Sequence, residues 1–313
     1  MLNNILIYLT HPHVDAWNFK PRHAEQIRKA LPGLEVVVCQ KSKEFLRRLP
    51  EAEGAVVWYF KRQWLDSAPR LRLIATPAAG KDWVEAEPTR SLEILFGSFH
   101  GPMIAESVAG AIFYFCKAFH LSREMQTQRW WEREKISQNM SSLSGARVTI
   151  LGFGHIGREI GRALKPFGCS ITGIKRIETA PPDYFTRGDR VVAADRMAEV
   201  LGSTDHLVMA LPGGTATDGM FKLEHFQALP RRCYLYNVGR GNVYREEDLA
   251  FALESRLIAG AYLDVFAREP LPESSPLWSM ENTLIQPHLS AASPRYLDLF
   301  VDELTAKIGT QPA

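Results

Sequence analysis

Short runs of hydrophobic, mostly branched residues recur along the chain and alternate with segments whose apolar residues follow a helical period. Five runs lie in the N-terminal third, and a second series begins near residue 146. The expected strands are 4–9, 35–40, 54–60, 71–77, 92–97, 146–152, 170–175, 189–194, 206–212, 233–239, 260–266 and 283–288. Strands that alternate with helices are typical of parallel sheets built from βαβ units. The pattern therefore predicts an α/β fold.

A long, mostly apolar segment separates the two series of strands. Its pattern predicts a single helix from Met103 to about Arg129, ending near Trp130 and Trp131. Two strand series on either side of such a helix predict two doubly wound parallel-sheet domains. The tail 296–308 has apolar residues at helical spacing and needs a surface to cover. The pattern alone does not say which domain it covers.

Composition narrows the class of protein. The 313 residues are 46% hydrophobic and 23% charged, with a net charge of +2, as in ordinary soluble globular proteins. This charge is too balanced to favour nucleic-acid binding. The longest apolar stretch, 108–116, is far shorter than the roughly 20 residues of a membrane helix. The N-terminal apolar run has no basic leader or cleavage site, so we expect no signal peptide.

Cysteines and histidines offer little sign of a metal. The cysteines are widely scattered, with no metal or redox spacing: Cys39, Cys116, Cys169 and Cys233. We interpret them as reduced, mostly buried thiols of a cytoplasmic protein. His11 and His13 resemble a metal-binding pair, but no third ligand is visible, so we predict no metal site.

The most informative local motif is Gly152-x-Gly154-x-x-Gly157, which directly follows the expected strand 148–151 and opens a helix. The first glycine permits a tight turn, the second lets a diphosphate approach the backbone, and the third lets helix and strand pack closely. Phosphates are then bound by the free N–H groups of the helix N-terminus. A simple turn and a methyltransferase-like loop are the alternatives. The second strand at 170–174 favours a dinucleotide site.

Two basic residues stand where a dinucleotide site that prefers NAD carries an acid. Lys175 and Arg176 end the second strand, at the distance from the glycines where a carboxylate would bind the adenosine ribose hydroxyls. Two cations suit a 2′-phosphate instead. We therefore predict a preference for NADP(H), with NAD(H) still possible; the alternative is two solvated side chains at a strand end.

Three later stretches carry a family resemblance: "LYNVGRGNVYREEDL" (235–249), "GAYLDVFAREPLP" (260–272) and "TLIQPHLSAAS" (283–293). Together with "GFGHIG" (152–157), they resemble the D-isomer-specific 2-hydroxyacid dehydrogenases, near the glyoxylate/hydroxypyruvate reductases. The resemblance covers nearly the whole chain and rests on four ordered motifs at matching spacings. A methyltransferase does not account for the three later motifs.

The resemblance implies a particular domain organisation. A Rossmann cofactor domain, 101–287, is expected to be inserted into a discontinuous flavodoxin-like substrate domain, 1–100 plus 288–313. The C-terminal helix would then cover the N-terminal domain. The family also implies a homodimer formed through the region after residue 103.

The family's catalytic roles transfer by motif to three residues. Arg240 would clamp the substrate carboxylate and polarise the carbonyl group. His288 would protonate the new alkoxide and act as the base in reverse. Glu269 would pair with His288 and favour its protonated form. Asp264 would lie near the nicotinamide amide.

The same resemblance assigns further residues to the two ligands. The loop 76–82 matches the family loop whose backbone N–H groups bind the substrate carboxylate, which implicates Ala78, Ala79 and Gly80. The family often has glycine at position 78, so alanine restricts this backbone more. Lys81 is another departure: it would meet a second acidic group on the substrate or point into water, and we favour water.

Trp58 and Lys61 follow an expected strand, where ligands of such sheets bind, and would shape the substrate pocket. An aromatic corner of the core is the alternative. The cofactor set implied by the family comprises Gly152, Gly154, His155, Ile156, Gly157, Lys175, Arg176, Leu211, Pro212, Thr217, Val238 and Asp264.

The sequence thus predicts an enzyme that transfers a hydride from NADPH or NADH to a small 2-oxo acid such as glyoxylate or hydroxypyruvate, giving a D-2-hydroxy acid. The alternative is a non-catalytic, dinucleotide-sensing module of the same fold, as in some corepressors. Retention of the Arg240, Glu269 and His288 set favours catalysis.

Overall fold

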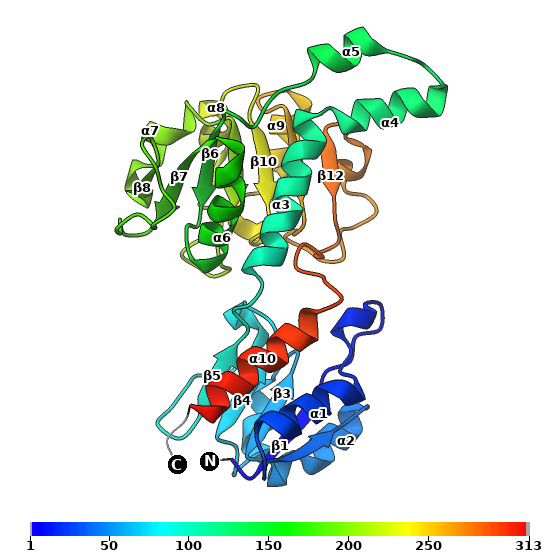
Figure 1. Ribbon diagram of the computed structural model, residues 1–313, viewed down its shortest axis with the longest axis vertical. Coiled ribbons are helices and arrows are strands. Elements are labelled where there is room, and N and C mark those ends of the chain that lie inside the picture. The colour runs from blue at the N-terminus through cyan, green and yellow to red at the C-terminus, as the bar shows by residue number, and fades with distance from the viewer. Residues whose placement is uncertain (1, 311–313) are drawn as a thin grey trace. The chain divides into compact units, whose positions relative to one another are not determined.

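A computed structural model describes residues 2–310 and divides them into two compact units (Figure 1). Unit 1 runs from the N-terminus to His100 and resumes at Ala292, and unit 2 is Gly101–Ala291. The second boundary thus lies after the predicted one, which preceded His288. Residues 288–291 stay with unit 2 because the N–H groups of His288 and Leu289 donate to Asp264 of that unit, at 2.8 and 2.7 Å.

Unit 1 is built on a five-stranded parallel sheet with the strand order β2-β1-β3-β4-β5. Its strands are β1 (Asn4–Tyr8), β2 (Glu35–Val38), β3 (Gly54–Val57), β4 (Leu73–Thr76) and β5 (Glu93–Phe96). Its helices are α1 (Pro21–Ala30), α2 (Ser42–Arg48) and α10 (Tyr296–Gly309). This order is the flavodoxin-like one, so the predicted fold is confirmed.

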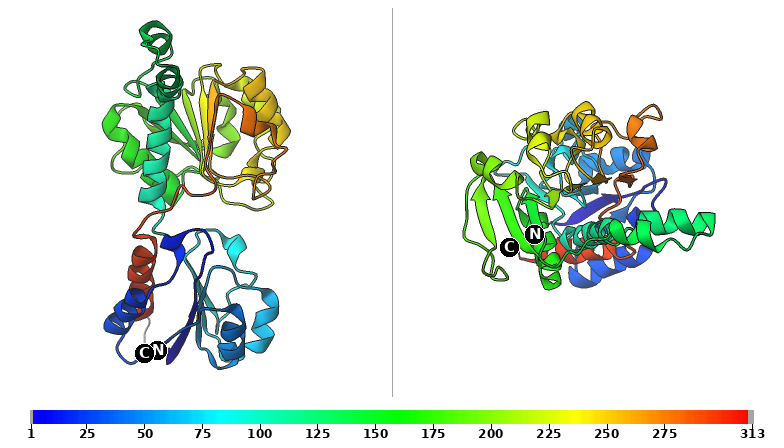
Figure 2. Two further views of the ribbon diagram at one scale, coloured as in Figure 1. Left: turned by 90° about the vertical axis from the view of Figure 1, so that its right-hand side faces the viewer. Right: turned by 90° about the horizontal axis from the view of Figure 1, so that it is seen from above.

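The C-terminal helix α10 belongs to unit 1. It lies beside α1 on one face of the five-stranded sheet, while α2 lies on the other face (Figure 2). Leu297, Phe300, Val301 and Leu304, which repeat at helical spacing, are all buried. Burial of these four side chains holds the C-terminal helix on unit 1, although the strands of that unit come from the start of the chain.

Unit 2 is built on a seven-stranded sheet, again entirely parallel, with the order β12-β11-β10-β9-β6-β7-β8. Its strands are β6 (Arg147–Leu151), β7 (Ser170–Lys175), β8 (Arg190–Ala193), β9 (His206–Met209), β10 (Tyr234–Asn237), β11 (Gly260–Leu263) and β12 (Thr283–Ile285). From β8 to β11 this is the Rossmann order, and the order reverses between β6 and β9.

Helices cover both faces of this sheet (Figure 2). The helices of unit 2 are α3 (Gly101–Cys116), α4 (Phe119–Gln128), α5 (Arg133–Gln138), α6 (His155–Leu164), α7 (Ala198–Leu201), α8 (Leu223–Ala228) and α9 (Glu246–Glu254). Of these, α4 and α5 extend away from the sheet (Figure 1). Ile112 of α3 and Ile160 of α6 pack with Ile150 of β6 in one core cluster. Phe226 of α8 and Leu249 of α9 belong to the cluster on the other face. A sheet buried on both sides explains the nearly continuous apolar strands.

The single long helix predicted for 103–129 is wrong. The structure ends α3 at Cys116 and begins α4 at Phe119, with Ala118 in the left-handed region at φ 49° and a bend of 59° between the helices. No glycine or proline marks this break, and the helical spacing of apolar residues continues across it, so the sequence predicted one helix. The bend matters because it directs α4 away from the sheet of unit 2 (Figure 1).

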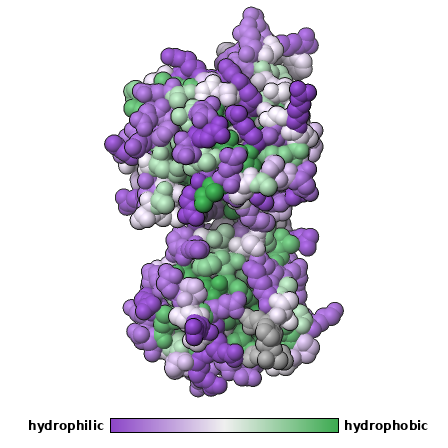
Figure 3. Space-filling model, turned by 90° about the vertical axis from the view of Figure 1, so that its left-hand side faces the viewer, coloured by the Kyte–Doolittle hydropathy of each residue, from purple (hydrophilic) through white to green (hydrophobic). Residues whose placement is uncertain are grey.

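Within residues 2–310, no single helix is both long enough and apolar enough to cross a membrane; α3 and α4 pass that test only as a bent pair. On the face drawn in Figure 3, hydrophilic side chains dominate the surface of unit 2, and hydrophobic ones form small patches. The four cysteines are free and buried.

Close packing at one strand position gives a test of the fold. A Cβ atom added at Gly173, in the middle of β7, would lie 2.3 Å from Cγ of the fully buried Phe153. We expect Gly173→Ala to destabilise the protein by about 1–3 kcal/mol, the usual cost of overpacking. Gly110→Ala is the matched control, since position 110 is an exposed site on α3 with open space around it. It should be neutral or stabilise by up to about 1 kcal/mol. Equal calorimetric melting temperatures for Gly173→Ala and wild type would contradict this packing.

Candidate active site

The three predicted catalytic residues follow three neighbouring strands of unit 2. Arg240 comes after β10, Glu269 after β11 and His288 after β12, and these strands are adjacent in the sheet. In a parallel sheet the carboxyl ends of all strands meet at one edge, where ligands of such folds bind. The topology therefore brings together residues that are far apart in the sequence.

His288 and Glu269 form a direct pair. Nδ1 of His288 lies 2.8 Å from Oε2 of Glu269, and the other carboxylate oxygen accepts the N–H of Phe266 at 3.0 Å. With Nδ1 bound to the carboxylate, Nε2 is the ring nitrogen left for a substrate oxygen. The His288 side chain retains 41% of its accessible surface, so it is reachable.

The pKa of His288 is raised above the ordinary 6.5. Burial lowers this pKa, but the hydrogen bond to Glu269 and the negative charges of Glu269 and Asp264 outweigh it. Arg240 acts in the opposite direction, and its charge also lowers the pKa of Glu269. Glu269, Asp264 and Arg240 are thus all within electrostatic reach of His288, and together their charges favour its protonated form.

A buried asparagine holds the loop that carries Arg240. The Asn237 side chain is fully buried, and its Nδ2 donates to the Arg240 carbonyl at 3.0 Å and to Oη of Tyr244 at 2.9 Å. Its Oδ1 accepts the N–H of Gly239 at 3.1 Å. The sequence analysis gave Asn237 no role; the signal was its place at the head of the N-x-x-R-G motif.

The Arg240 side chain is braced on both sides. Its Nη1 donates to the carbonyl of Gly239 at 2.9 Å. A Cβ atom added at Gly213 would lie 3.3 Å from Cγ of Arg240, so the aliphatic part of the arginine packs on the loop after β9. The guanidinium is therefore oriented by its surroundings before any ligand arrives.

The glycine motif forms a cradle suited to a diphosphate. Gly152 has φ +95°, and a Cβ atom there would lie 2.6 Å from the Ala210 carbonyl oxygen. A Cβ atom on Gly157 would lie 2.5 Å from the Gly152 carbonyl oxygen. Gly154, by contrast, has nothing within 4 Å and immediately precedes α6. The motif thus leaves open space at a helix N-terminus, which is the geometry that a dinucleotide needs.

Other predicted cofactor residues line the same sheet edge. His155 is exposed at the first position of α6, and Ile156 packs against the core. Leu211 and Pro212 follow β9, where Oγ1 of Thr217 donates to the Pro212 carbonyl at 2.7 Å. The further members of the set lie at the ends of β7, β10 and β11: Lys175, Arg176, Val238 and Asp264.

Lys175 and Arg176 lie at the end of β7. Nζ of Lys175 is 3.5 Å from Oγ1 of Thr179, and the Arg176 side chain is exposed. Within residues 2–310, neither cation forms an ion pair with a carboxylate. Their charges are therefore not neutralised by the described part of the chain.

In unit 1, the predicted substrate loop follows β4. The N–H of Ala78 donates to Oγ1 of Thr76 at 3.2 Å, so it is already used. For the N–H groups of Ala79 and Gly80 the described residues supply no acceptor. Oγ1 of Thr76 also donates to the Trp58 carbonyl at 3.0 Å, which ties the end of β3 to this loop.

The remaining candidates in unit 1 are at its surface. Lys61 and Lys81 are both exposed. His11 and His13 place their ring centroids 6.1 Å apart. Nowhere in residues 2–310 do three histidine, cysteine or acidic side chains gather in a way that could hold a metal ion.

Comparison with known proteins identifies the family. The sequence profile of the D-isomer specific 2-hydroxyacid dehydrogenase NAD binding domain matches residues 109–290. The human glyoxylate reductase/hydroxypyruvate reductase is 26% identical over 287 residues, covering 90% of this chain and 82% of the human protein. Glyoxylate/hydroxypyruvate reductase A of Salmonella choleraesuis is 27% identical over 257 residues, with 77% and 78% coverage.

Solved structures agree. A D-isomer specific 2-hydroxyacid dehydrogenase family protein from Aeromonas salmonicida has 29% identity and a TM-score of 0.81, covering 100% of this chain and 97% of that one. An NADPH-dependent glyoxylate/hydroxypyruvate reductase from Sinorhizobium meliloti, in complex with NADP and sulfate, has 25% identity and a TM-score of 0.80, covering 98% and 95%. This chain belongs to the D-isomer-specific 2-hydroxyacid dehydrogenase family. It is an NAD(P)-dependent oxidoreductase with a nicotinamide dinucleotide as its cofactor.

The His288–Glu269 pair generates a pH prediction. If His288 donates the proton in reduction, activity is full below its raised pKa and falls as pH increases through it. Glu269→Gln removes the main contribution that raises this pKa, so the falling limb of kcat/KM should move to lower pH. The control is Glu254→Gln, an exposed glutamate on α9. If the falling limb of the kcat/KM profile stays at the same pH in Glu269→Gln, the Glu269 carboxylate has no part in proton transfer.

Proposed function

We propose that the protein is an NADPH-preferring reductase of small 2-oxo acids such as glyoxylate or hydroxypyruvate, giving D-2-hydroxy acids. The observation that carries this proposal is the convergence of Arg240, Glu269 and His288 at one sheet edge, with His288 and Glu269 2.8 Å apart. Relatives at 26–27% identity that are named for this activity support it.

Each residue has a role in the proposed reaction. Arg240 presents two parallel donors to the substrate carboxylate and fixes the position of the carbonyl carbon. A bound reduced nicotinamide supplies the hydride. Nε2 of His288 donates a proton to the carbonyl oxygen as charge develops there, while Glu269 holds the ring and stabilises its charged form. In unit 1, the family resemblance assigns the N–H groups of Ala79 and Gly80 to carboxylate binding and Trp58 to the wall of the substrate pocket.

Removing the proton donor tests the proposal. His288→Ala should leave NADPH binding nearly intact and reduce turnover of glyoxylate roughly 100- to 10,000-fold, because general acid catalysis is lost. Arg240→Lys should also lose most activity, since a point charge does not replace a two-pronged contact. A His288→Ala enzyme with half the wild-type kcat would place the donor elsewhere. Wild-type protein that binds NADPH but turns over no 2-oxo acid would instead support a dinucleotide-sensing module.

The coenzyme preference rests on the end of β7. No acid stands there to accept ribose hydroxyls, whereas Lys175 and Arg176 offer two cations that are not ion-paired within the described chain. Similar structures from Xanthobacter autotrophicus and Sinorhizobium meliloti, both 25% identical, contain NADPH and NADP. These observations support a 2′-phosphate site in this chain.

The preference can be measured and reversed. Hydrogen bonds to a charged group contribute about 1.5–3 kcal/mol, so NADPH should be favoured over NADH by roughly ten- to a hundredfold in kcat/KM. The factor should shrink with added salt, because the contact is partly exposed. Lys175→Asp should favour NADH by restoring a ribose acceptor and repelling the phosphate. Arg190→Asp, at the opposite end of neighbouring β8, is the control. Equal use of both coenzymes by wild type would mean that the cations face solvent.

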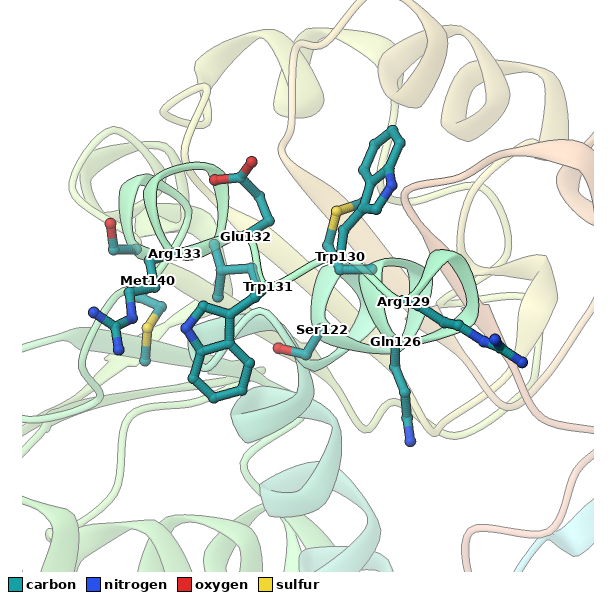
Figure 4. A pocket seen from close by; sticks show the side chains of 11 residues that line it. Ser122, Gln126, Arg129, Trp130, Trp131, Glu132, Arg133 and Met140 are labelled. Carbon is teal, nitrogen blue, oxygen red and sulfur yellow. The ribbon is translucent and has the colours of Figure 1, made fainter.

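We further propose a homodimer that forms through the arm, defined as residues 119–140. Among the described residues, four exposed large hydrophobic side chains lie in the arm and none on α3: Trp130 is 63% exposed, Trp131 86%, Phe119 54% and Met140 47%. Large aromatic side chains exposed together favour a protein partner. A groove of about 760 Å³ lies in the arm (Figure 4). Its lining is Ser122, Met125, Gln126, Arg129, Trp130, Trp131, Glu132, Arg133, Ile136, Ser137 and Met140.

A second copy is the simplest occupant, because a two-fold axis places the same surface on both partners. Light scattering at micromolar concentration should give twice the 35.3 kDa mass of one chain. The double variant Trp130→Ala/Trp131→Ala should shift the protein toward monomer. Phe251→Ala, which removes an aromatic that is 51% exposed on α9, should not. A monomeric wild type would contradict the dimer.

The buried, free cysteines favour a cytoplasmic location.

A further inference from the structure

The turn that carries His288 is held in an unfavourable backbone conformation. His288 has φ +54°, in the left-handed region that a residue with a side chain rarely adopts. Such a conformation persists only when its surroundings impose it.

Three successive N–H groups of this turn donate to one residue. The N–H of His288 donates to the Asp264 carbonyl at 2.8 Å, and the N–H groups of Leu289 and Ser290 donate to Oδ1 of the Asp264 carboxylate at 2.7 and 3.0 Å. The N–H of Ser290 also reaches Oδ2, at 3.1 Å. Successive N–H groups beside a left-handed residue form a concave anion site. Here the anion is a side chain of the protein itself.

The Asp264 side chain is fully buried, and the N–H groups of the turn supply hydrogen bonds to its carboxylate. The family resemblance placed Asp264 near the nicotinamide amide. Its two carboxylate oxygens also accept the N–H groups of residues 289 and 290, so Asp264 has a second role within the protein itself. Charged acceptors make the stronger hydrogen bonds, which suits a group that must hold a strained turn.

Helix α3 contacts the same turn from the other side. Oγ of Ser107 donates to the Ser290 carbonyl at 2.8 Å. Gln286, two residues before the turn, is also fixed, since Oη of Tyr262 on β11 donates to its Oε1 at 2.6 Å. The turn is therefore bound at its N–H groups and at one carbonyl, and the side chain of Gln286 just before it is held as well. Ser107 belongs to none of the motifs that carry the family resemblance.

We propose that the Asp264 carboxylate and the Ser107 hydroxyl are positioning groups that hold the 288–290 turn, and with it the His288 imidazole, in the orientation that proton transfer requires. This inference rests on the proposed function for its catalytic consequence. Its structural part concerns only the turn and can be tested without substrate. The charged groups that face His288 are Glu269, Asp264 and Arg240.

The experiment compares Asp264→Asn and Ser107→Ala with wild type in two measurements. Hydrogen exchange, followed in peptides spanning 286–291 without coenzyme, should speed up at least about tenfold in Asp264→Asn, since a charged acceptor of two N–H groups is lost. With glyoxylate and saturating NADPH, kcat should fall by at least a similar factor, while the Kd for NADPH changes less than about threefold. Ser107→Ala should change both in the same direction by a smaller factor, and Ser107→Thr should restore them.

Ser203→Ala is the matched control, because Oγ of Ser203 also donates to a backbone carbonyl in unit 2, that of Val200 at 3.0 Å. It should leave exchange at 286–291 and kcat unchanged. Unaltered exchange in Asp264→Asn, or weaker NADPH binding with kcat retained, would overturn the inference. If Asp264→Asn does not fold, Ser107→Ala decides the question. If wild type reduces no 2-oxo acid, the proposed function fails while the exchange data still test the turn.

Discussion

Parallel pairing of every strand in the seven-stranded sheet is the constraint on which the candidate site depends. It brings all carboxyl ends to one edge, so the loops after β7, β6, β9, β10, β11 and β12 meet there in spatial order. The basic pair follows β7, the glycine cradle follows β6, and the Arg240, Glu269 and His288 loops follow the last three strands. The sheet order therefore places the proposed adenosine, diphosphate and reaction sites one after another along this edge.

Chemistry at this edge depends on how a few charges balance. Glu269 and Asp264 favour the charged form of His288, and burial and Arg240 oppose it. Reduction of a 2-oxo acid needs a proton donor that is charged at neutral pH, beside a cation that binds the substrate carboxylate. Two acids raise the pKa of His288, and they make different contacts. Glu269 contacts the imidazole directly, whereas Asp264 binds the backbone of its turn.

Local signals were enough to predict much of the fold, but not all of it. Apolar runs located the strands, and their alternation with helices gave the parallel sheets. The break at Ala118 was missed because it carries no glycine or proline and the apolar period continues through it. Likewise, motifs located Arg240, Glu269 and His288. Ser107 was missed because its hydrogen bond joins segments that are far apart in the sequence. Asn237 was missed for another reason: its partners are close in the sequence, but none of the motifs assigned it a role.

The most direct test of the account follows the hydride itself. The purified protein is incubated with hydroxypyruvate and NADPH that carries deuterium at C4 on the transferred face, and the product is analysed by mass spectrometry and chiral chromatography. We predict glycerate of the D configuration with one deuterium at C2, formed in step with coenzyme oxidation. Product without deuterium, product of mixed configuration, or no product from this or any other small 2-oxo acid would contradict the account.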